Sequence, residues 1–162
     1  MGIFKPNYFY DKIWDIPVSF LIENDFKCVL LDVDNTLTTH DNPEPRSEVI
    51  SWLSEVKNAG IVPVIVSNNT EPRVAPFAKR IGVDFVSRAK KPLAKGTKDA
   101  VKLTGIPKKH MLVIGDQIFT DILFGKWSGV KTVLVEPFKL EKMTFFKIKR
   151  FLEGIILGRK RG

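Results

Sequence analysis

The stretch "CVLLDVDNT" (28–36) decides how this sequence is interpreted, because an apolar run ends there in two aspartates, Asp32 and Asp34. Four further short apolar runs follow, and helix-like segments separate them: 61–67, 83–87, 110–116 and 130–136. Continuous runs rich in valine and isoleucine favour a parallel sheet covered on both faces. We therefore predict an α/β fold, three-layered and Rossmann-like, with a five-stranded parallel sheet.

Polar side chains follow four of these runs, at the edge where ligands bind in such a sheet. They are Asp32 and Asp34, then Ser67 with Asn68 and Asn69, then Lys90 and Lys91, then Asp116. Three converging carboxylates require a cation, and ligands that are all oxygen favour a hard cation such as Mg²⁺. A lysine and a hydroxyl could hold phosphate oxygens, while one carboxylate attacks phosphorus and another carries a proton. The pattern indicates phosphate chemistry.

Four motifs in this order resemble those of the haloacid-dehalogenase (HAD) superfamily: "DVDNT" (32–36), "IVSNN" (65–69), "KKP" (90–92) and "VIGDQIFTD" (113–121). One such match would be weak evidence, but four, each at a strand end, are specific. The residues of these four motifs are more similar still to those of subfamily IIIA and its YqeG-type branch. That branch is similar to the mitochondrial phosphatidylglycerophosphate phosphatase.

The resemblance implies an enzyme, a HAD-type phosphatase, and it implies a role for each matched residue. Asp32 would be the nucleophile and Asp34 the general acid and base. The phosphoryl group would be bound by Ser67, Asn68 and Lys91, the lysine directly before the proline.

The resemblance also implies a ligand set for Mg²⁺. The ion would be bound by Asp32, by Asp116 and by the backbone carbonyl of Asp34. Asp121 would orient the metal-bound waters without binding the ion itself. A non-catalytic phosphate-binding scaffold is an alternative for this chain. Binding phosphate alone does not require a nucleophile and an acid together, which argues against that alternative.

The spacing of the motifs leaves no room for a cap domain. Asp32 and Ser67 are 35 positions apart, and Ser67 and Lys91 are 24 apart, which is enough for one helix in each interval. The predicted domain (1–137) is therefore capless, and an open site suits a large substrate.

The net charge of +8 is concentrated in the segment 138–162, which has eight basic and two acidic residues. A helix there would gather apolar side chains on one side and basic ones around the rest, as in elements that lie on anionic membranes. Alternatively, its apolar side could pack on the domain. Nucleic acid is a less favoured partner, because no aromatic side chains are interleaved for stacking at the basic end.

We expect the substrate to be a phosphomonoester, phosphatidylglycerophosphate by the branch resemblance. The alternative is a soluble sugar phosphate, nucleotide or nucleic-acid end. The single cysteine, Cys28, is typical of a reducing compartment, so we expect a cytoplasmic protein, peripheral on the inner face of the membrane. The sequence leaves open whether the protein is an oligomer.

Three other interpretations of the first motif fit the sequence less well. A calcium-binding EF-hand loop would need glycine where Leu37 stands and glutamate where Pro43 stands. A response-regulator receiver would need an aspartate after the third strand, where this chain has Ser87 and Arg88. An ordinary strand end and turn would not explain the three later motifs.

Overall fold

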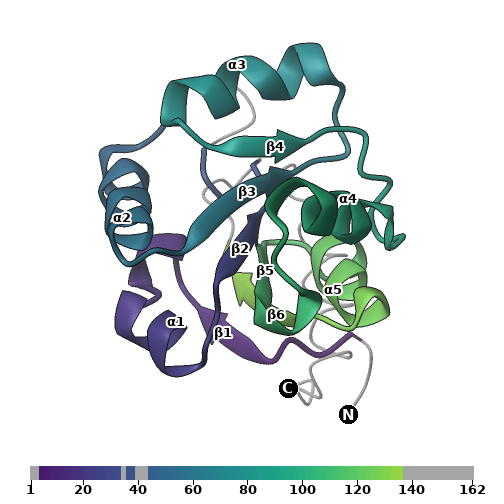
Figure 1. Ribbon diagram of the computed structural model, residues 1–162, viewed down its shortest axis with the longest axis horizontal. Helices are drawn as coiled ribbons and strands as arrows, with labels where there is room; N and C mark the ends of the chain where they lie inside the picture. The colour runs from purple at the N-terminus through teal and green to yellow at the C-terminus, as the bar shows by residue number, and fades with distance from the viewer. Residues whose placement is uncertain (1–3, 34–35, 39–43, 137–162) are drawn as a thin grey trace, which may run out of the picture.

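Six parallel strands form one sheet in the computed structural model, which describes residues 4–33, 36–38 and 44–136. Their order across the sheet is β1-β6-β5-β2-β3-β4 (Figure 1). The strands are β1 (Tyr8–Tyr10), β2 (Cys28–Leu31), β3 (Val62–Val66), β4 (Asp84–Val86), β5 (Met111–Gly115) and β6 (Lys131–Val135). The parallel sheet is confirmed, but the predicted number of five strands was one too few.

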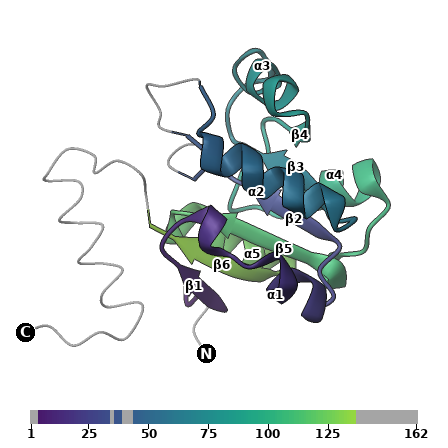
Figure 2. The same cartoon turned by 90° about the vertical axis from the view of Figure 1, so that its left-hand side faces the viewer.

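Helices lie on both faces of the sheet, so the three-layer prediction is confirmed. Figures 1 and 2 show α1 and α2 on one face and α4 and α5 on the other. The helical elements are η1 (Ile13–Asp15), α1 (Val18–Glu23), α2 (Ser47–Asn58), α3 (Glu71–Ile81), α4 (Lys95–Thr104), η2 (Lys108–His110), η3 (Ile118–Ile122) and α5 (Leu123–Ser128). Among the described residues, α2 and β3 lie between Asp32 and Ser67, and α3 and β4 lie between Ser67 and Lys91. No cap domain is inserted among these described residues.

Strand β2 shows why the apolar runs are continuous. Val29 and Leu31 point into the core beneath α1 and α2, whereas Cys28 and Leu30 point into the core on the α4 side. All four are buried, because neighbouring residues of a strand face opposite sides of the sheet and both sides are covered. Burial also raises the pKa of the Cys28 thiol to about 12, which makes this cysteine inert at neutral pH.

The order of the strands places a topological switch point between β2 and β5. The chain runs outward from β2 through β3 to β4, and then returns to lay β5 on the other side of β2. Leu31 is in register with Ile65 on one side and with Ile114 on the other. Ligands of open α/β sheets bind at the carboxyl ends of the strands beside such a point.

The strand that the sequence did not predict is β1, at the edge of the sheet. It has three residues, half-buried or exposed, and pairs with β6 from Tyr8 opposite Val133 onward. Just before it, the Asn7 backbone N–H donates to Thr132 O at 3.1 Å, and the Asn7 side-chain oxygen accepts from Thr132 N–H at 3.0 Å. A short aromatic segment with little burial lacks the apolar run that identified the other strands.

Two sequence predictions fall on segments that the structure does not describe. They are the role of Asp34 and the behaviour of the segment 138–162. In the part of the chain that is described, no helix is both long and apolar enough to cross a bilayer.

Candidate active site

Asp32 stands at the switch point, directly after β2. Its backbone N–H donates to Ile114 O at 3.1 Å, so it continues the pairing between β2 and β5 by one residue. Its side chain is 18% exposed, whereas the side chain of Asp121 is 2% exposed. Of Asp32 and Asp121, Asp32 is therefore the one whose carboxylate a substrate can reach from solvent.

Lys91 connects two carboxylates that come from distant parts of the chain. Its Nζ lies 3.0 Å from Oδ1 of Asp32 and 2.8 Å from Oδ1 of Asp121, and its side chain is 4% exposed. The neighbouring Lys90 is exposed to solvent. The structure thus brings Lys91 into the site and leaves Lys90 outside it.

The buried charges alter one another's protonation. Burial by itself lowers the pKa of Lys91, but Asp121 and Asp32 outweigh it and raise that pKa above its usual value. Burial and then the negative charge of Asp32 raise the pKa of Asp121 to about 6, against the opposing effect of Lys91. Lys91 therefore remains cationic at neutral pH, in contact with both Asp32 and Asp121.

Three carboxylates form a cluster that fits a divalent cation. One oxygen from each of Asp32, Asp116 and Asp121 lies within 4.8 Å of the others. Asp116, which follows β5, is 2% exposed. With Lys91, these groups carry a net charge of −2, so a dication would balance them, and a donor set of carboxylate oxygens suits Mg²⁺. Asp121, which was expected only to orient waters, belongs to this cluster.

A turn of π-helix, η3, brings Asp121 back towards β5. Backbone N–H groups of Asp121 and Ile122 both donate to Gln117 O, at 2.9 and 3.2 Å, and Gln117 N–H donates to Oδ2 of Asp121 at 3.3 Å. The Asp121 carboxylate lies so close to Gly115 that a Cβ on this glycine would overlap it. Gly115 therefore makes room for the carboxylate that binds Lys91.

Replacing Gly115 with alanine is expected to displace Asp121 and lower phosphatase turnover by about 10²-fold, the effect of a misplacement of about 1 Å in a site. Ile114→Val, one position earlier, removes a core methyl and leaves Asp121 in place. Steady-state kinetics of both folded variants would measure the difference. Equal activity of Gly115→Ala and the unchanged protein would contradict this role of Gly115.

Ser67 and Asn68 follow β3 and lie beside the lysine loop, the segment 87–94 between β4 and α4 that carries Lys91. Ser67 is buried, and its Oγ accepts from Asn69 N–H at 3.1 Å, which leaves the hydroxyl hydrogen available to donate to a phosphate oxygen. The Asn68 side chain instead contacts Lys91: Oδ1 accepts from Lys91 N–H at 2.7 Å, and Nδ2 donates to Lys91 O at 3.2 Å. Sequence reasoning gave no sign of this contact.

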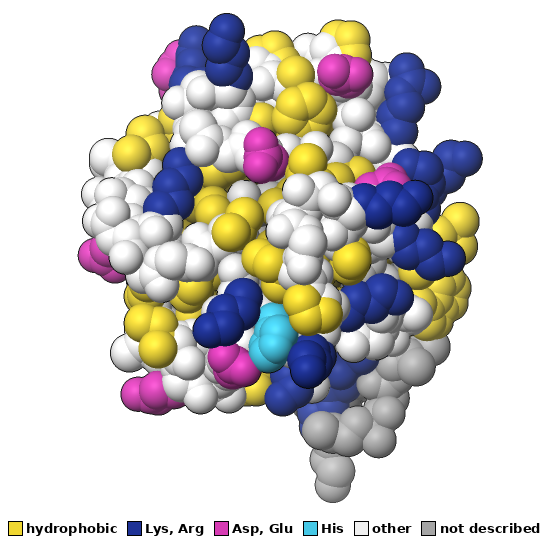
Figure 3. All heavy atoms as spheres, viewed as in Figure 1, with side chains coloured by type: hydrophobic (Ala, Val, Ile, Leu, Met, Phe, Trp, Pro, Cys, Tyr) yellow, Lys and Arg dark blue, Asp and Glu magenta, His cyan; other side chains and the backbone are white. Residues whose placement is uncertain are grey.

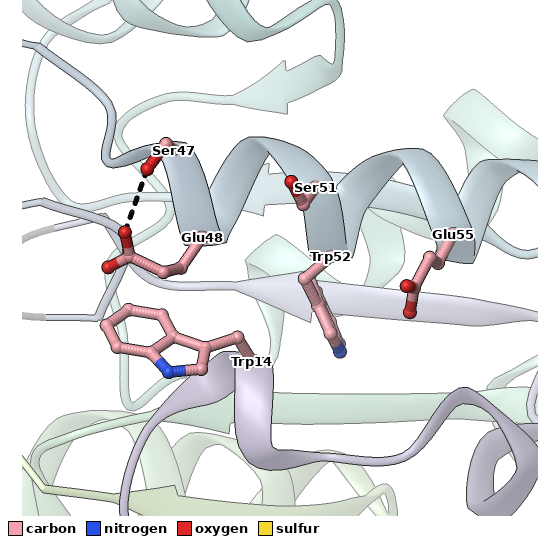
Figure 4. A pocket seen from close by; sticks show the side chains of 6 residues that line it. All are labelled: Trp14, Ser47, Glu48, Ser51, Trp52 and Glu55. Atoms are coloured by element: carbon pink, nitrogen blue, oxygen red, sulfur yellow. Dashed lines mark hydrogen bonds between the residues drawn. The ribbon is translucent and has the colours of Figure 1, made fainter.

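A separate hollow of about 320 Å³ lies between η1 and α2 (Figure 4). It is lined by Trp14, Ser47, Glu48, Ser51, Trp52 and Glu55. Its two charged lining residues are glutamates, and Glu48 accepts a hydrogen bond from Ser47 at 2.8 Å. A negatively charged lining disfavours phosphate, so this hollow does not compete with the Asp32 site for that role.

Comparison with known proteins identifies the family. The model of the haloacid dehalogenase-like hydrolases matches residues 39–129. The chain belongs to this family. It is 37% identical over 155 residues, which is 96% of this chain and 90% of the relative, to a Bacillus subtilis protein named "Probable phosphatase YqeG". This chain is therefore a HAD-type phosphatase, as its motifs predicted.

A second relative is "Phosphatidylglycerophosphate phosphatase 1, chloroplastic/mitochondrial" of Arabidopsis thaliana, 29% identical over 83% of this chain and 41% of the relative. This chain spans about two fifths of that protein.

Solved structures show the same fold. A 4-nitrophenylphosphatase from Thermotoga maritima has a TM-score of 0.60 at 12% identity and covers 76% of this chain and 91% of its own. A deoxy-D-mannose-octulosonate 8-phosphate phosphatase from Haemophilus influenzae, in a cobalt-bound form, has a TM-score of 0.56 at 16% identity, covering 83% and 91%.

Proposed function

We propose that this protein hydrolyses phosphomonoesters with Mg²⁺ and forms an aspartyl-phosphate at Asp32. The observation that carries the proposal is a partly exposed carboxylate, held by a buried lysine, at the edge of a buried acidic cluster. A bound Mg²⁺ would be held by Asp32 and Asp116, with Asp121 of the same cluster and, by the motif resemblance, the backbone carbonyl of Asp34. It would supply positive charge that polarises the phosphoryl group.

The chemistry divides into two steps. An Asp32 oxygen attacks phosphorus, the bond from phosphorus to the leaving oxygen breaks, and Asp34 gives that oxygen a proton. Water then attacks the aspartyl-phosphate, Asp34 takes a proton from it, and inorganic phosphate leaves as the Asp32 carboxylate re-forms. Lys91 and the Ser67 hydroxyl donate hydrogen bonds to the phosphoryl oxygens and stabilise the charge that these oxygens gain during the reaction. The role of Asp34 rests on the resemblance of "DVDNT" to the family motif.

Magnesium is expected to raise the melting temperature of the protein, because it would relieve repulsion among three clustered carboxylates. For a domain of this size, each kcal/mol of binding free energy corresponds to about 2–4 °C. Asp116→Asn should lose most of the shift, while Asp84→Asn, an exposed control that removes the same charge, should keep it. Thermal melts with and without Mg²⁺ would decide, and an undiminished shift in Asp116→Asn would contradict this metal site.

For the substrate, we propose the phosphate of phosphatidylglycerophosphate at a membrane surface, on the cytoplasmic side. The name of the Arabidopsis relative, the absence of a cap among the described residues and the basic segment 138–162 support this assignment. The described domain adds a further observation, the basic side of α4.

Helix α4 exposes three lysines along one side. Lys95, Lys98 and Lys102 are exposed, while Gly96, Thr97 and Ala100 of the same helix are buried against the sheet. Figure 3 shows lysine and arginine side chains gathered along the side of the molecule that carries α4. Helix α4 begins four positions after Lys91. Lys95 pairs with Asp99 of the same helix at 2.7 Å, so Lys98 and Lys102 are the charges that suit contact with anionic headgroups.

A substrate panel tests the substrate assignment. Phosphatidylglycerophosphate in vesicles should be hydrolysed more efficiently than p-nitrophenyl phosphate, a sugar phosphate or a nucleotide. A sugar phosphate or nucleotide that equals the lipid would favour the soluble-phosphatase alternative. If no member of the panel releases phosphate in the presence of Mg²⁺, the proposed reaction is wrong.

Vesicle binding tests the membrane contact. Lys98→Gln combined with Lys102→Gln should weaken binding to phosphatidylglycerol-containing vesicles by about 30-fold, at roughly 1 kcal/mol for each lysine. The control is Arg73→Gln with Lys79→Gln, which removes two exposed charges from α3. Sedimentation of both proteins, and of a version that lacks residues 138–162, would separate the two basic surfaces. Equal binding of the α4 variant and its control would contradict a contact through α4.

A further inference from the structure

The loops that carry Ser67 and Lys91 form one hydrogen-bonded unit. Ser67 N–H donates to Val86 O, Ala89 N–H to Ser67 O, and Arg88 N–H to Asn69 O, each at 2.9 Å. These bonds continue the pairing of β3 with β4 beyond the ends of both strands. The lysine loop is therefore held by the loop that follows β3.

The backbone of the lysine loop has an unfavourable conformation that needs such support. Arg88 and Lys90 have φ values of +48° and +56°, in the left-handed region that residues other than glycine seldom adopt. Such residues persist when their surroundings hold them in place, and they occur often at functional sites. Lys91 follows immediately, and its side chain must reach both Asp32 and Asp121.

The Asn68 amide binds the backbone of Lys91 through both of its ends. Its oxygen accepts from Lys91 N–H at 2.7 Å, and its nitrogen donates to Lys91 O at 3.2 Å. Both contacts join Asn68 to the residue whose Nζ lies 3.0 Å from Asp32. The motif resemblance treats Asn68 as a phosphate ligand, whereas its oxygen and its nitrogen both face protein backbone here.

We infer that Asn68 is a positioning residue, which acts on the phosphoryl group by fixing the backbone of Lys91. The inference rests on the proposed function for its effect on turnover, but the contact itself does not. Lys91 Nζ is at the end of a long flexible side chain, so a shift of its backbone would move the charge away from Asp32. A direct phosphate ligand and a positioning residue predict different results when both residues are changed.

A double-mutant cycle separates these roles. Asn68→Ala should lower kcat for p-nitrophenyl phosphate, and affinity for inorganic phosphate with Mg²⁺, by about tenfold, the effect of two lost hydrogen bonds. In a Lys91→Met background, Asn68→Ala should have no further effect, because Asn68 would act only through that lysine. If the two effects multiply in phosphate affinity measured by calorimetry, Asn68 contacts phosphate directly and the inference is wrong.

Asn69→Ala is the matched control, because it truncates the next side chain and keeps the Asn69 backbone bonds to Arg88 and Ser67. It should leave kcat unchanged. Hydrogen exchange by NMR gives a readout that needs no activity: the Lys91 amide should exchange faster in Asn68→Ala than in Asn69→Ala. Equal exchange would overturn the inference. A protein without phosphatase activity would overturn the proposed function, while the exchange measurement would still test the contact.

Discussion

Replacing Asp32 with asparagine is expected to lower turnover of a small phosphomonoester by about 10³-fold or more, as removal of a nucleophile does in other enzymes. Asparagine nearly preserves the shape of the side chain but cannot form an acyl phosphate as readily as a carboxylate. It also removes a charge that Lys91 neutralises, at 3.0 Å. Mg²⁺-dependent release of p-nitrophenol would measure the loss.

Two further measurements make the Asp32 result specific. Acid-quenched protein should carry phosphate on Asp32, detectable by mass spectrometry, and the variant should carry none. The exposed-site variant Asp84→Asn, which has the same change of charge, should retain full turnover. Turnover by Asp32→Asn that approached that of the control would rule out attack by this carboxylate.

Replacing Lys91 with methionine is expected to lower kcat by about 10²- to 10³-fold, the range for loss of one preorganised electrostatic contact. Methionine is similar in length and has no charge, so two hydrogen-bonded carboxylates would lose their shared donor. Breaking a buried ion pair from one side typically destabilises a protein by about 3–5 kcal/mol. We therefore also expect a lower melting temperature without metal.

Lys90→Met is the matched control, because it changes the adjacent lysine, which is exposed. It should leave both kcat and the melting temperature close to those of the unchanged protein. Denaturant unfolding and steady-state kinetics on the two variants would give both quantities. If Lys90→Met were as inactive as Lys91→Met, the loop would matter as a whole and the specific ion pairs would not explain the effect.

The sheet was largely predictable, because strands buried on both faces leave continuous apolar runs in the sequence. The edge strand β1 was not, because its partner β6 lies more than a hundred residues away and its own residues are only partly buried. Local sequence patterns therefore predict burial better than they predict the pairing of segments that are distant in the sequence.

The candidate site was predictable as a set of residues, because parallel strands place their carboxyl ends together and Asp32, Ser67 and Asp116 follow such ends. Its contacts were not predictable. The position of Asp121 depends on the π-helical turn and on the space beside Gly115, and the bond from Asn68 to Lys91 depends on two neighbouring loops. Such contacts arise from three-dimensional geometry, which motif spacing does not encode.

The edge strand β1 also has a consequence for how the chain folds during synthesis. The bonds between Asn7 and Thr132 join residues 125 positions apart. The ribosome therefore releases the aromatic segment around Tyr8 long before its partner β6 exists. Contacts between such distant segments slow folding and leave apolar groups exposed in the meantime. The docking of this segment on β6 should therefore be among the last steps of folding.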